Sequence, residues 1–234
     1  MVMRNLIAVV PARGGSKRIP RKNLIEFFGR PMIAWTIDAA RQTGLFDRII
    51  VSTDDEEIAA TGQQWGAEVP FRRQGHADDH APVAAATIVA VEQARAHFDE
   101  NYRTVVQLMP NCPLRGAAEI YKAVEAFWAR DPVFQISCFT LSWMNPWWAA
   151  ELDQSGHPKY LFKGRIQMRS QDLPRLYCPT GAIWVANARR LREVGTFYGP
   201  GHVFEPLEWR AAIDIDDEHD LAMAKALFAA NQTL

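Results

Sequence analysis

The chain has 234 residues, a formal net charge of −1 and a hydrophobic fraction of 48%. This length suffices for one domain with a full core, and the near-zero charge gives no general field to attract nucleic acid or an anionic membrane. No apolar run approaches the roughly 20 residues of a membrane-spanning helix, and no signal-peptide pattern precedes the first strand. The three cysteines lack the spacing of a disulfide framework or a zinc site. We therefore expect a cytoplasmic protein with no nucleic-acid or membrane partner.

Strand and helix patterns alternate along most of the chain. Apolar runs at 6–10 and 48–52 predict strands that are covered on both faces. Strands separated by helices predict βαβ units, and hence an α/β fold with a mostly parallel sheet and helices on both faces. Further strands are expected at 104–109, 134–139, 181–186 and 210–216, and helices at 31–44, 54–66, 81–98, about 116–129 and 217–230.

The alternation breaks at residues 140–178, which have poor helical periodicity, several turn signals and three of the eight tryptophans. We interpret this stretch as a segment inserted into one domain of residues 1–234, not as a separate domain. Large apolar side chains that project from a core need cover. A dimer contact through Trp143, Trp147 and Trp148 is favoured over the alternative, in which these rings fold back on the parent domain.

The first strand runs into a basic loop, "PARGGSKRIPRKN" at 11–23. Ligands of open α/β sheets bind beyond the carboxyl ends of the strands, where this loop lies. Gly14 and Gly15 allow positive φ and close backbone approach, so amides can form an anion-binding nest. The loop matches neither GxGxxG nor GxxxxGK[ST], and a solvated basic turn is the weaker alternative after a buried strand. The cations that would hold an anion are Arg13, Lys17, Arg18, Arg21 and Lys22.

An acidic pair lies near the end of the chain, in "AIDIDDEHDL". On a strand, Asp214 and Asp216 would face one side and Ile213 and Ile215 the other. Two carboxylates on one face repel unless a cation lies between them, and Mg²⁺ prefers such oxygen ligands. The three acids of 217–220 suit the first turn of the closing helix, and a helix N-cap is the alternative for Asp216. Basic loop and acidic pair together predict a nucleoside triphosphate site with Mg²⁺.

The same stretches carry a family resemblance. "PARGGSKRIPRKN", "FDRIIVSTDDEEIA", "PLR", "GAIWV" and "IDIDDEHDL" follow one another as they do in the acylneuraminate cytidylyltransferases, the CMP-sialic acid synthetase group. The chain resembles this family over nearly its whole length. The resemblance implies a Rossmann-like α/β fold, a homodimer with a domain-swapped segment, and the reaction of CTP with a nonulosonic acid to a CMP-sugar and pyrophosphate.

Position by position, the resemblance implies which residues hold each ligand. It assigns Mg²⁺ to Asp214 and Asp216. Around the acylamino group of the sugar it places Trp184, Phe197 and Tyr198, which would be ordinary core by residue chemistry alone. The nucleotide is assigned to Arg13, Gly14, Ser16, Lys17, Lys22 and Asn23 of the basic loop and to Arg72 in "VPFRR".

Departures from the family pattern lie on the sugar side. Met109 in "LMPNCPLR" stands where the family commonly has a substrate-contacting glutamine, and Trp148 stands where a lysine is expected. The stretch "RSQDL" at 169–173 is more like the enzymes that act on pseudaminic acid. Arg169 is then the candidate for the sugar carboxylate, because arginine binds carboxylates bidentately, and Gln171 is a further substrate-binding candidate. The sugar stays open between N-acetylneuraminic, legionaminic and pseudaminic acid.

The expected mechanism is attack of the sugar C2 hydroxyl on the α-phosphate, which depends on positioning and charge neutralisation. Arg13 and Lys22 would stabilise the phosphates, Asp214 and Asp216 would hold Mg²⁺, and Asp214 is the better candidate for a general base. Two alternatives remain. One is a synthetase for an eight-carbon keto acid such as Kdo, and the other is a non-catalytic nucleotide-sugar sensor on the same fold.

Overall fold

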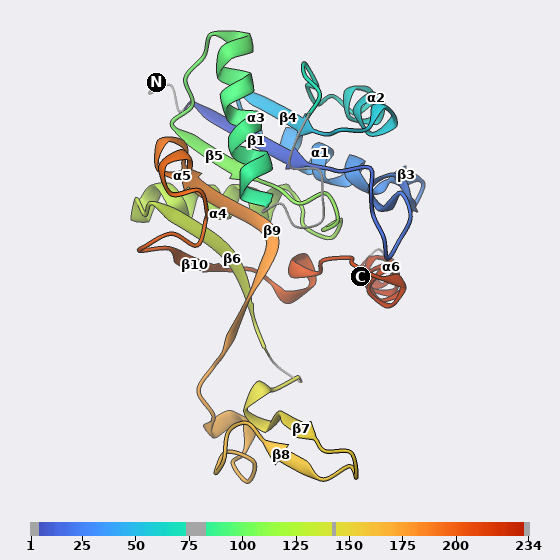
Figure 1. Cartoon of the computed structure of the whole chain (residues 1–234), viewed down its shortest axis with the longest axis vertical. Coiled ribbons are helices and arrows are strands. Elements are labelled where there is room, and N and C mark those ends of the chain that lie inside the picture. The colour runs from blue at the N-terminus through green and yellow to red at the C-terminus, as the bar shows by residue number, and fades with distance from the viewer. Residues whose placement is uncertain (1–4, 74–82, 142–143, 232–234) are drawn as a thin grey trace.

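A computed structural model describes residues 5–73, 83–141 and 144–231. Its centre is a six-stranded sheet of order β10-β6-β9-β5-β1-β4 (Figure 1). β1 pairs in parallel with β4 and β5, and β10 with β6, whereas β9 runs antiparallel between β5 and β6. The predicted α/β class with a mostly parallel sheet is therefore confirmed. The strands are β1 (Leu6–Pro11), β4 (Arg48–Ser52), β5 (Thr104–Gln107), β6 (Phe134–Thr140), β9 (Tyr177–Asn187) and β10 (Val203–Pro206).

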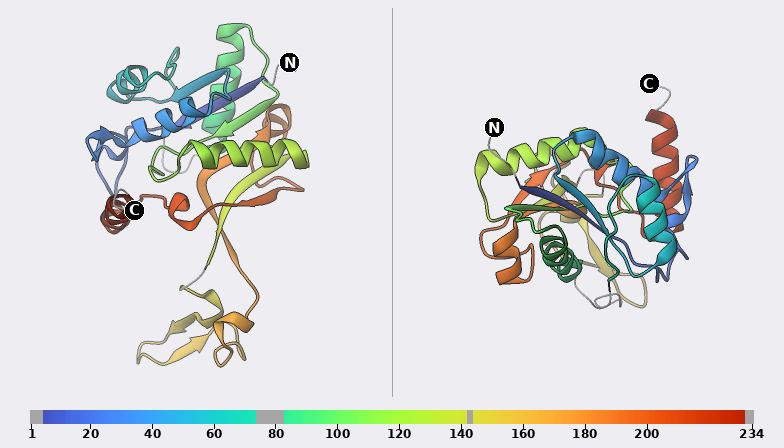
Figure 2. Two further views of the ribbon diagram at one scale, coloured as in Figure 1. Left: turned by 180° about the vertical axis from the view of Figure 1, so that it is seen from behind. Right: turned by 90° about the horizontal axis from the view of Figure 1, so that it is seen from above.

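Helices cover both faces of the sheet, with α1, α2 and α4 on one side and α3 and α5 on the other (Figure 2). β1 shows why the sequence folds this way. Leu6, Ala8 and Val10 pack under the first group of helices, and Ile7 and Val9 under the second. No helix of the described ranges is long and apolar enough to span a bilayer. The helices are α1 (Met32–Thr43), α2 (Glu56–Gln64), α3 (Val83–Phe98), α4 (Ala117–Arg130), α5 (Ala188–Val194) and α6 (Glu218–Asn231).

A third, smaller core joins the basic loop to the end of the chain. Ile19 of the loop packs with Ile213 and Ile215, with Met32 at the start of α1, and with Leu221 of α6. All five side chains are buried. Because the loop and residues 213–216 share this core, two stretches about 200 positions apart in the sequence are held side by side. This packing places the functional residues together. The short strands β2 (Glu26–Phe27) and β3 (Arg30–Pro31) form a hairpin between the loop and α1.

β6 and β9 continue beyond the sheet as two stems and carry a projecting segment (Figure 1). This segment contains the antiparallel pair β7 (Ala150–Leu152) and β8 (Pro158–Tyr160) and short 3-10 turns. The Trp147 indole donates a 2.8 Å hydrogen bond to the Pro174 carbonyl and packs on Phe162 at 4.8 Å between ring centroids. Trp147 therefore packs within the segment itself, Trp148 is exposed, and Trp143 lies outside the described residues.

The strand expected at 210–216 is wrong. A 3-10 turn at Trp209–Ala212 is followed by extended chain with no ladder partner. The edge position beside β6 is occupied by β10, and the sequence analysis missed both β10 and α5. Extended backbone alone still alternates side chains, so Ile213 and Ile215 point into the core and the two aspartates point away from it.

Candidate active site

The basic loop leaves β1 at its carboxyl end and is fixed by its own side chains. The Gly14 amide donates to an Asp54 carboxylate oxygen at 3.1 Å, and the Asn23 side-chain amide donates to the Arg13 carbonyl at 3.0 Å. Asn23, which is buried at the start of a short 3-10 turn, therefore closes the loop on itself. These hydrogen bonds hold the loop in place, while Lys17, Arg18 and Arg21 stay exposed.

The glycines of the loop serve a different purpose from the one expected. Neither Gly14 nor Gly15 adopts positive φ, and the left-handed residue is Arg21, with φ 55°. A Cβ on Gly14 would lie 2.7 Å from a carboxylate oxygen of Asp55, whereas a Cβ on Gly15 would meet nothing within 4 Å. Gly14 is therefore needed for a close approach between the loop and the chain after β4.

Part of the negative charge around the loop comes from the protein itself. Arg21 pairs with Asp55 and with Glu57. Arg18 lies 2.8 Å from one oxygen of Asp216, and Lys22 lies 2.9 Å from the other. Burial of Asp216 raises its pKa, but the hydrogen bond and charge of Lys22, with the charge of Arg18, outweigh burial and leave that pKa lowered. The basic loop and the acidic pair thus form one site, as predicted.

Asp214 is the more deeply buried member of the pair. Its Oδ1 accepts a hydrogen bond from the Asn111 side-chain amide, which also donates to the Ile215 carbonyl at 3.0 Å. The Ile215 amide in turn donates to the Asn111 carbonyl at 2.9 Å. Burial and the charge of Asp216 raise the pKa of Asp214 to about 6, although Lys22 partly opposes them. Asp214 is therefore a carboxylate whose negative charge is poorly compensated in the absence of a ligand.

A helix N-cap was the alternative role for Asp216, but Asp217 and Asp220 accept the hydrogen bonds at the start of α6 instead. Asp217 accepts from the amides of His219 at 2.9 Å and Asp220 at 3.0 Å. Asp220 accepts from the amides of Asp216 at 2.9 Å and Asp217 at 3.1 Å. These acids fix the start of α6, and the Asp216 carboxylate remains directed at the cations of the basic loop.

Asp214 and Asp216 fit a divalent cation that is shared with phosphate oxygens. In the described ranges no group of three or more His, Cys, Asp or Glu side chains is placed to hold a metal ion. One or two carboxylates with the substrate's phosphates is the usual Mg²⁺ arrangement. The raised pKa of Asp214 supports this fit, because a cation between the two carboxylates would relieve their repulsion.

Of the two adjacent arginines in "VPFRR", Arg73 faces the site. Arg72 is exposed, whereas Arg73 is buried with Nη2 3.7 Å from Asp54. Its Nε is buried without a hydrogen-bond partner. Burial, and to a smaller extent the charge of Arg13, lower the pKa of Arg73, although Asp54 opposes this. This geometry adds Arg73 to the candidates, because pattern alone does not say which of two arginines points inward, and the assignment of the nucleotide to Arg72 stays a prediction.

A buried arginine supports the site and was not anticipated as a site residue. Arg115, only 1% exposed, donates to the carbonyls of Ala182 at 2.5 Å and Met109 at 3.3 Å. Its other Nη donates to the Thr36 hydroxyl at 2.6 Å. Burial lowers the pKa of Arg115. This side chain joins the loop after β5 to β9, and the available signal was a lone cation in the apolar stretch "CPLRG".

On the sugar side, Met109 lies against β9 next to the acidic pair. A Cβ on Gly181 would lie 3.0 Å from the Met109 side chain and 3.2 Å from Oδ2 of Asp214, so these three residues converge. The Trp184 indole reaches back along β9 and donates to the Thr180 carbonyl at 2.8 Å. Trp184 therefore points along β9 toward Thr180 and Gly181, and Gly181 lies beside Asp214.

The structure brings the predicted aromatic trio together. Trp184 packs on Phe197 at 5.3 Å and on Tyr198 at 5.7 Å between ring centroids. Phe197 is fully buried and belongs to the core, whereas Tyr198 is 46% exposed. Core packing thus explains Phe197, and Trp184 with Tyr198 forms a surface that a ligand can contact.

Arg169 and Gln171 are not part of that surface within one chain. Arg169 forms a 2.8 Å ion pair with Asp172, in a short 3-10 turn of the projecting segment. Gln171 lines a cavity of the same segment together with Trp148. Figure 1 shows the segment well away from the sheet on which Trp184 lies. The structure does not bring these two residues to the site of their own chain.

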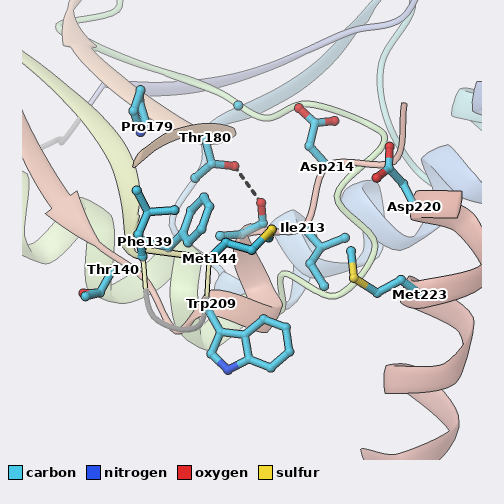
Figure 3. Close-up of a pocket in the computed structure, with 13 residues that line it drawn as sticks. Phe139, Thr140, Met144, Pro179, Thr180, Trp209, Ile213, Asp214, Asp220 and Met223 are labelled. Atoms are coloured by element: carbon cyan, nitrogen blue, oxygen red, sulfur yellow. Dashed lines mark hydrogen bonds between the residues drawn. The ribbon is translucent and has the colours of Figure 1, made fainter. Parts of the chain in front are cut away.

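A cavity of about 310 Å³ lies beside Asp214, where β6 and β9 leave the sheet (Figure 3). Apolar side chains form most of its wall, including Met144, Trp209 and Met223. The Thr180 hydroxyl donates to the Ala212 carbonyl at 2.8 Å and closes one side. Asp214 is therefore bordered by apolar surface at the base of the projecting segment.

A basic loop at the carboxyl end of a parallel strand, facing paired carboxylates, defines a nucleotidyltransferase on a Rossmann-like fold. A family model described as cytidylyltransferase matches residues 7–138. The chain is 34% identical over 231 residues to a pseudaminic acid cytidylyltransferase of Campylobacter jejuni, with 98% of each chain covered. It is 32% identical to the CMP-N,N'-diacetyllegionaminic acid synthase of Legionella pneumophila, with 97% of each covered. The chain belongs to the cytidylyltransferases, in the CMP-nonulosonic acid synthetase family, and is a CTP-dependent nucleotidyltransferase.

The fold itself recurs in a more distant enzyme. A CMP:2-keto-3-deoxy-manno-octonic acid synthetase complexed with CTP superposes with a TM-score of 0.69 over 97% of this chain and 99% of that one. The two sequences are 16% identical, so this likeness concerns the fold alone.

Proposed function

We propose that this enzyme transfers the cytidylyl group of CTP to pseudaminic acid or a close nonulosonic acid relative, with Mg²⁺. The observation that carries the proposal is the meeting of Lys22 and Arg18 with Asp216, while Asp214 lies beside Gly181 on β9, the strand that also carries Trp184. The choice of sugar is supported by two Campylobacter jejuni relatives, 34% and 33% identical, that are named pseudaminic acid cytidylyltransferases. Because CTP is a cytoplasmic metabolite, we place the enzyme in the cytoplasm.

In the proposed reaction, the C2 hydroxyl oxygen of the sugar bonds to the α-phosphorus of CTP. The bond from this phosphorus to the oxygen that bridges to the β-phosphate breaks, and its electron pair leaves with pyrophosphate. The hydroxyl proton passes to a carboxylate, for which Asp214 is the candidate because it lies next to Gly181 of β9, toward the sugar side of the acidic pair.

Charge neutralisation falls to the residues that meet between the basic loop and the acidic pair. Lys22 and Arg18 would exchange Asp216 for phosphate oxygens, and Arg13 and Arg73 would neutralise the phosphates from the other side of the loop. Asp216, freed from its ion pairs, and Asp214 would then hold Mg²⁺, which when bound neutralises phosphate charge and lowers the pKa of the attacking hydroxyl. Gly14, Ser16, Lys17 and Asn23 would form the backbone and side-chain cradle.

We further propose that the enzyme is a homodimer formed through the projecting segment. Leu152 and Leu161 of this segment are 71% and 54% exposed, which is costly for an isolated surface. A second copy would cover them. The dimer would also allow Arg169 and Gln171 to reach the sugar side of the other copy's site, since they lie far from the aromatic trio of their own chain. Sedimentation should give twice the 26.4 kDa chain mass, and a stable monomer would contradict the dimer.

The decisive experiment is a substrate panel. Purified enzyme, CTP and Mg²⁺ are incubated with pseudaminic, legionaminic, N-acetylneuraminic and Kdo acids, and pyrophosphate release is followed with mass spectrometry of the CMP-sugar. We expect the highest kcat/KM for pseudaminic acid. A preference for Kdo would overturn the sugar class, and CTP binding without pyrophosphate release from any acid would favour a sensor.

A further inference from the structure

The aromatic trio is the beginning of a longer row of rings. Tyr198 contacts His202 at 5.6 Å, and His202 contacts Phe204 at 5.7 Å between centroids. With Trp184 at 5.7 Å from Tyr198, these four residues form what we call the aromatic row. It begins on β9 and ends at Phe204 on the edge strand β10. The last two rings were not among the residues expected from the sequence.

The backbone holds the row in place. Gly199 lies directly against Phe134 of the core, where a Cβ would come 2.4 Å from the ring. The His202 amide donates to the Gly199 carbonyl at 3.2 Å, and the His202 ring lies 3.1 Å from the same oxygen. The Tyr198 amide donates to the Thr196 hydroxyl at 3.1 Å. Because this turn is fixed by the core, Tyr198 and His202 are presented as a pre-formed surface.

The row also leads directly to the reacting end of the site. Trp184 donates to the Thr180 carbonyl at 2.8 Å, and a Cβ on the next residue, Gly181, would lie 3.2 Å from Asp214. A sugar whose C2 hydroxyl lies at Asp214 can therefore extend along Trp184 toward the outer rings. Tyr198 and Phe204 are 46% and 38% exposed, so the far end of the row is open to solvent.

We propose that Tyr198, His202 and Phe204 form a subsite for a second acylamino group of the nonulosonic acid. An acylamino group is a planar unit the size of one peptide group, so it covers about one ring and cannot occupy the whole row. Its methyl and amide faces stack on aromatic rings, while its polar edges stay hydrated at the exposed end. Trp184 contacts the first acylamino group, and the outer rings, those of Tyr198, His202 and Phe204, contact the second.

This inference rests on the proposed function and names the substrate more closely. The ligand is a nonulosonic acid with two acylamino groups, the substitution that the printed name of the Legionella pneumophila relative gives for its product. A nonulosonic acid with one acylamino group and a hydroxylated tail would leave the outer rings without a stacking partner. The row would therefore discriminate between the two classes by a difference in apolar contact, without any charged group.

The test compares kcat/KM for N,N'-diacetyllegionaminic acid with kcat/KM for N-acetylneuraminic acid in wild type, His202→Ala, Phe204→Ala and Phe204→Leu. We expect each alanine variant to lower the preference for the diacylated acid about 3–10-fold, with an intermediate effect of leucine. The KM for CTP should not change. Tyr121→Ala, which removes an equally exposed ring from α4, is the matched control and should leave the preference at the wild-type value.

The outcomes separate this inference from the proposed function. A wild-type enzyme that converts neither of these acids nor pseudaminic acid would refute the function itself, and for one that converts pseudaminic acid alone the variants are compared by their kcat/KM for that acid. An active enzyme whose alanine variants lose activity equally toward both acids, or toward neither, would overturn the subsite and leave the function intact. If Phe204→Ala lowers the thermal midpoint, His202→Ala and Phe204→Leu decide the question, because His202 lies in a loop and leucine retains an apolar side chain at the edge strand.

Discussion

The two halves of the candidate active site, which we assign to nucleotide and sugar, are built on opposite principles. On the nucleotide side, Arg18, Lys22 and Asp216 meet through ion pairs of 2.8 and 2.9 Å, close to solvent and next to a glycine-containing loop. On the sugar side, ring packing replaces charge, with Trp184 in contact with Phe197 and Tyr198. Charge can be exchanged for that of an incoming triphosphate, whereas ring surfaces must already have the shape of the group they bind.

This difference predicts how each half responds to substitution. Loss of one charge on the nucleotide side leaves its former partner unpaired, so turnover should fall steeply and for every sugar. Loss of one ring on the sugar side removes a part of a contact surface, so the effect should be smaller and should depend on the sugar. The following experiments take this comparison from the largest expected effect to the smallest.

Asp216→Asn should be the most damaging change. It keeps the size of the side chain but removes the charge that pairs with Lys22 and Arg18 and that we assign to Mg²⁺. We expect kcat to fall about 1,000-fold, with a modest change in CTP affinity measured by calorimetry. Asp131→Asn, at the left-handed C-cap of α4, is the control. Full activity of Asp216→Asn, or wild-type activity in EDTA, would remove the metal role.

Lys22→Ala comes next. The ammonium group is partly buried, with its side chain 16% exposed, so its contact with phosphate would be made away from bulk water. We expect kcat/KM to fall about 100-fold, or roughly 3 kcal/mol in transition-state binding, by the same factor for every sugar that is a substrate. Lys122→Ala on the exposed face of α4 should have no effect. A loss of kcat/KM that differs between sugars would place Lys22 on the sugar side and contradict the division of the site into a charged nucleotide side and an aromatic sugar side.

Asp214→Asn should lower turnover but stabilise the fold. The pKa of Asp214 is raised to about 6, above its unfolded value of about 3.9. Between these values the folded protein keeps a proton that the unfolded chain has lost, so stability falls as pH rises through this window and stays lower above it. The variant removes this penalty. At pH 7.5 in EDTA, urea unfolding should show a gain of about 3 kcal/mol over wild type.

In that experiment the pH dependence is the stronger criterion. Wild type should lose stability from about pH 4 to 6 relative to Asp214→Asn, and the two curves should run parallel above the window. An unchanged or lower urea midpoint for the variant at pH 7.5 would show that Asn111 and the surrounding dipoles already compensate the Asp214 charge.

Substitution of the adjacent arginines, Arg72 and Arg73, should have the smallest effect on the nucleotide side. Arg73 is buried against Asp54 at 3.7 Å, and Arg72 is exposed. We expect Arg73→Ala to raise the KM for CTP about tenfold, a loss of about 1.4 kcal/mol, while Arg72→Ala changes it less than twofold. Equal effects of the two variants on the KM for CTP would mean that burial does not decide which arginine contacts the nucleotide.

Several features of the fold follow directly from sequence pattern. The apolar run of β1 predicts a strand covered on both faces, and Leu6 and Ile7 do pack into different cores. The helix at 32–43 ends at Gly44, which adopts the left-handed conformation that such a terminus requires. These predictions succeed because backbone preference and side-chain periodicity act over a few neighbouring residues.

Local pattern was insufficient where two conformations give the same alternation. Ile213 and Ile215 alternate with Asp214 and Asp216 in a strand and equally in extended chain without a ladder. Hydrogen bonds from distant residues decide between them, and here the edge of the sheet is taken by β10. Which of Arg72 and Arg73 is buried is decided in the same way, since burial is a property of the packed chain.

The sequence by itself determined the α/β class through its alternating patterns, and it determined the basic loop and the acidic pair because each is one contiguous stretch with its own chemistry, whereas the aromatic residues followed from the family resemblance. Only the tertiary structure decided how they combine. Ile19, Ile213 and Ile215 bury their side chains in one small core, and this burial brings Asp216 within reach of Lys22. The extension of the aromatic row to His202 and Phe204 also depends on the turn that packs on Phe134. Such contacts arise from the shared exclusion of water by residues far apart in sequence, which no local pattern encodes.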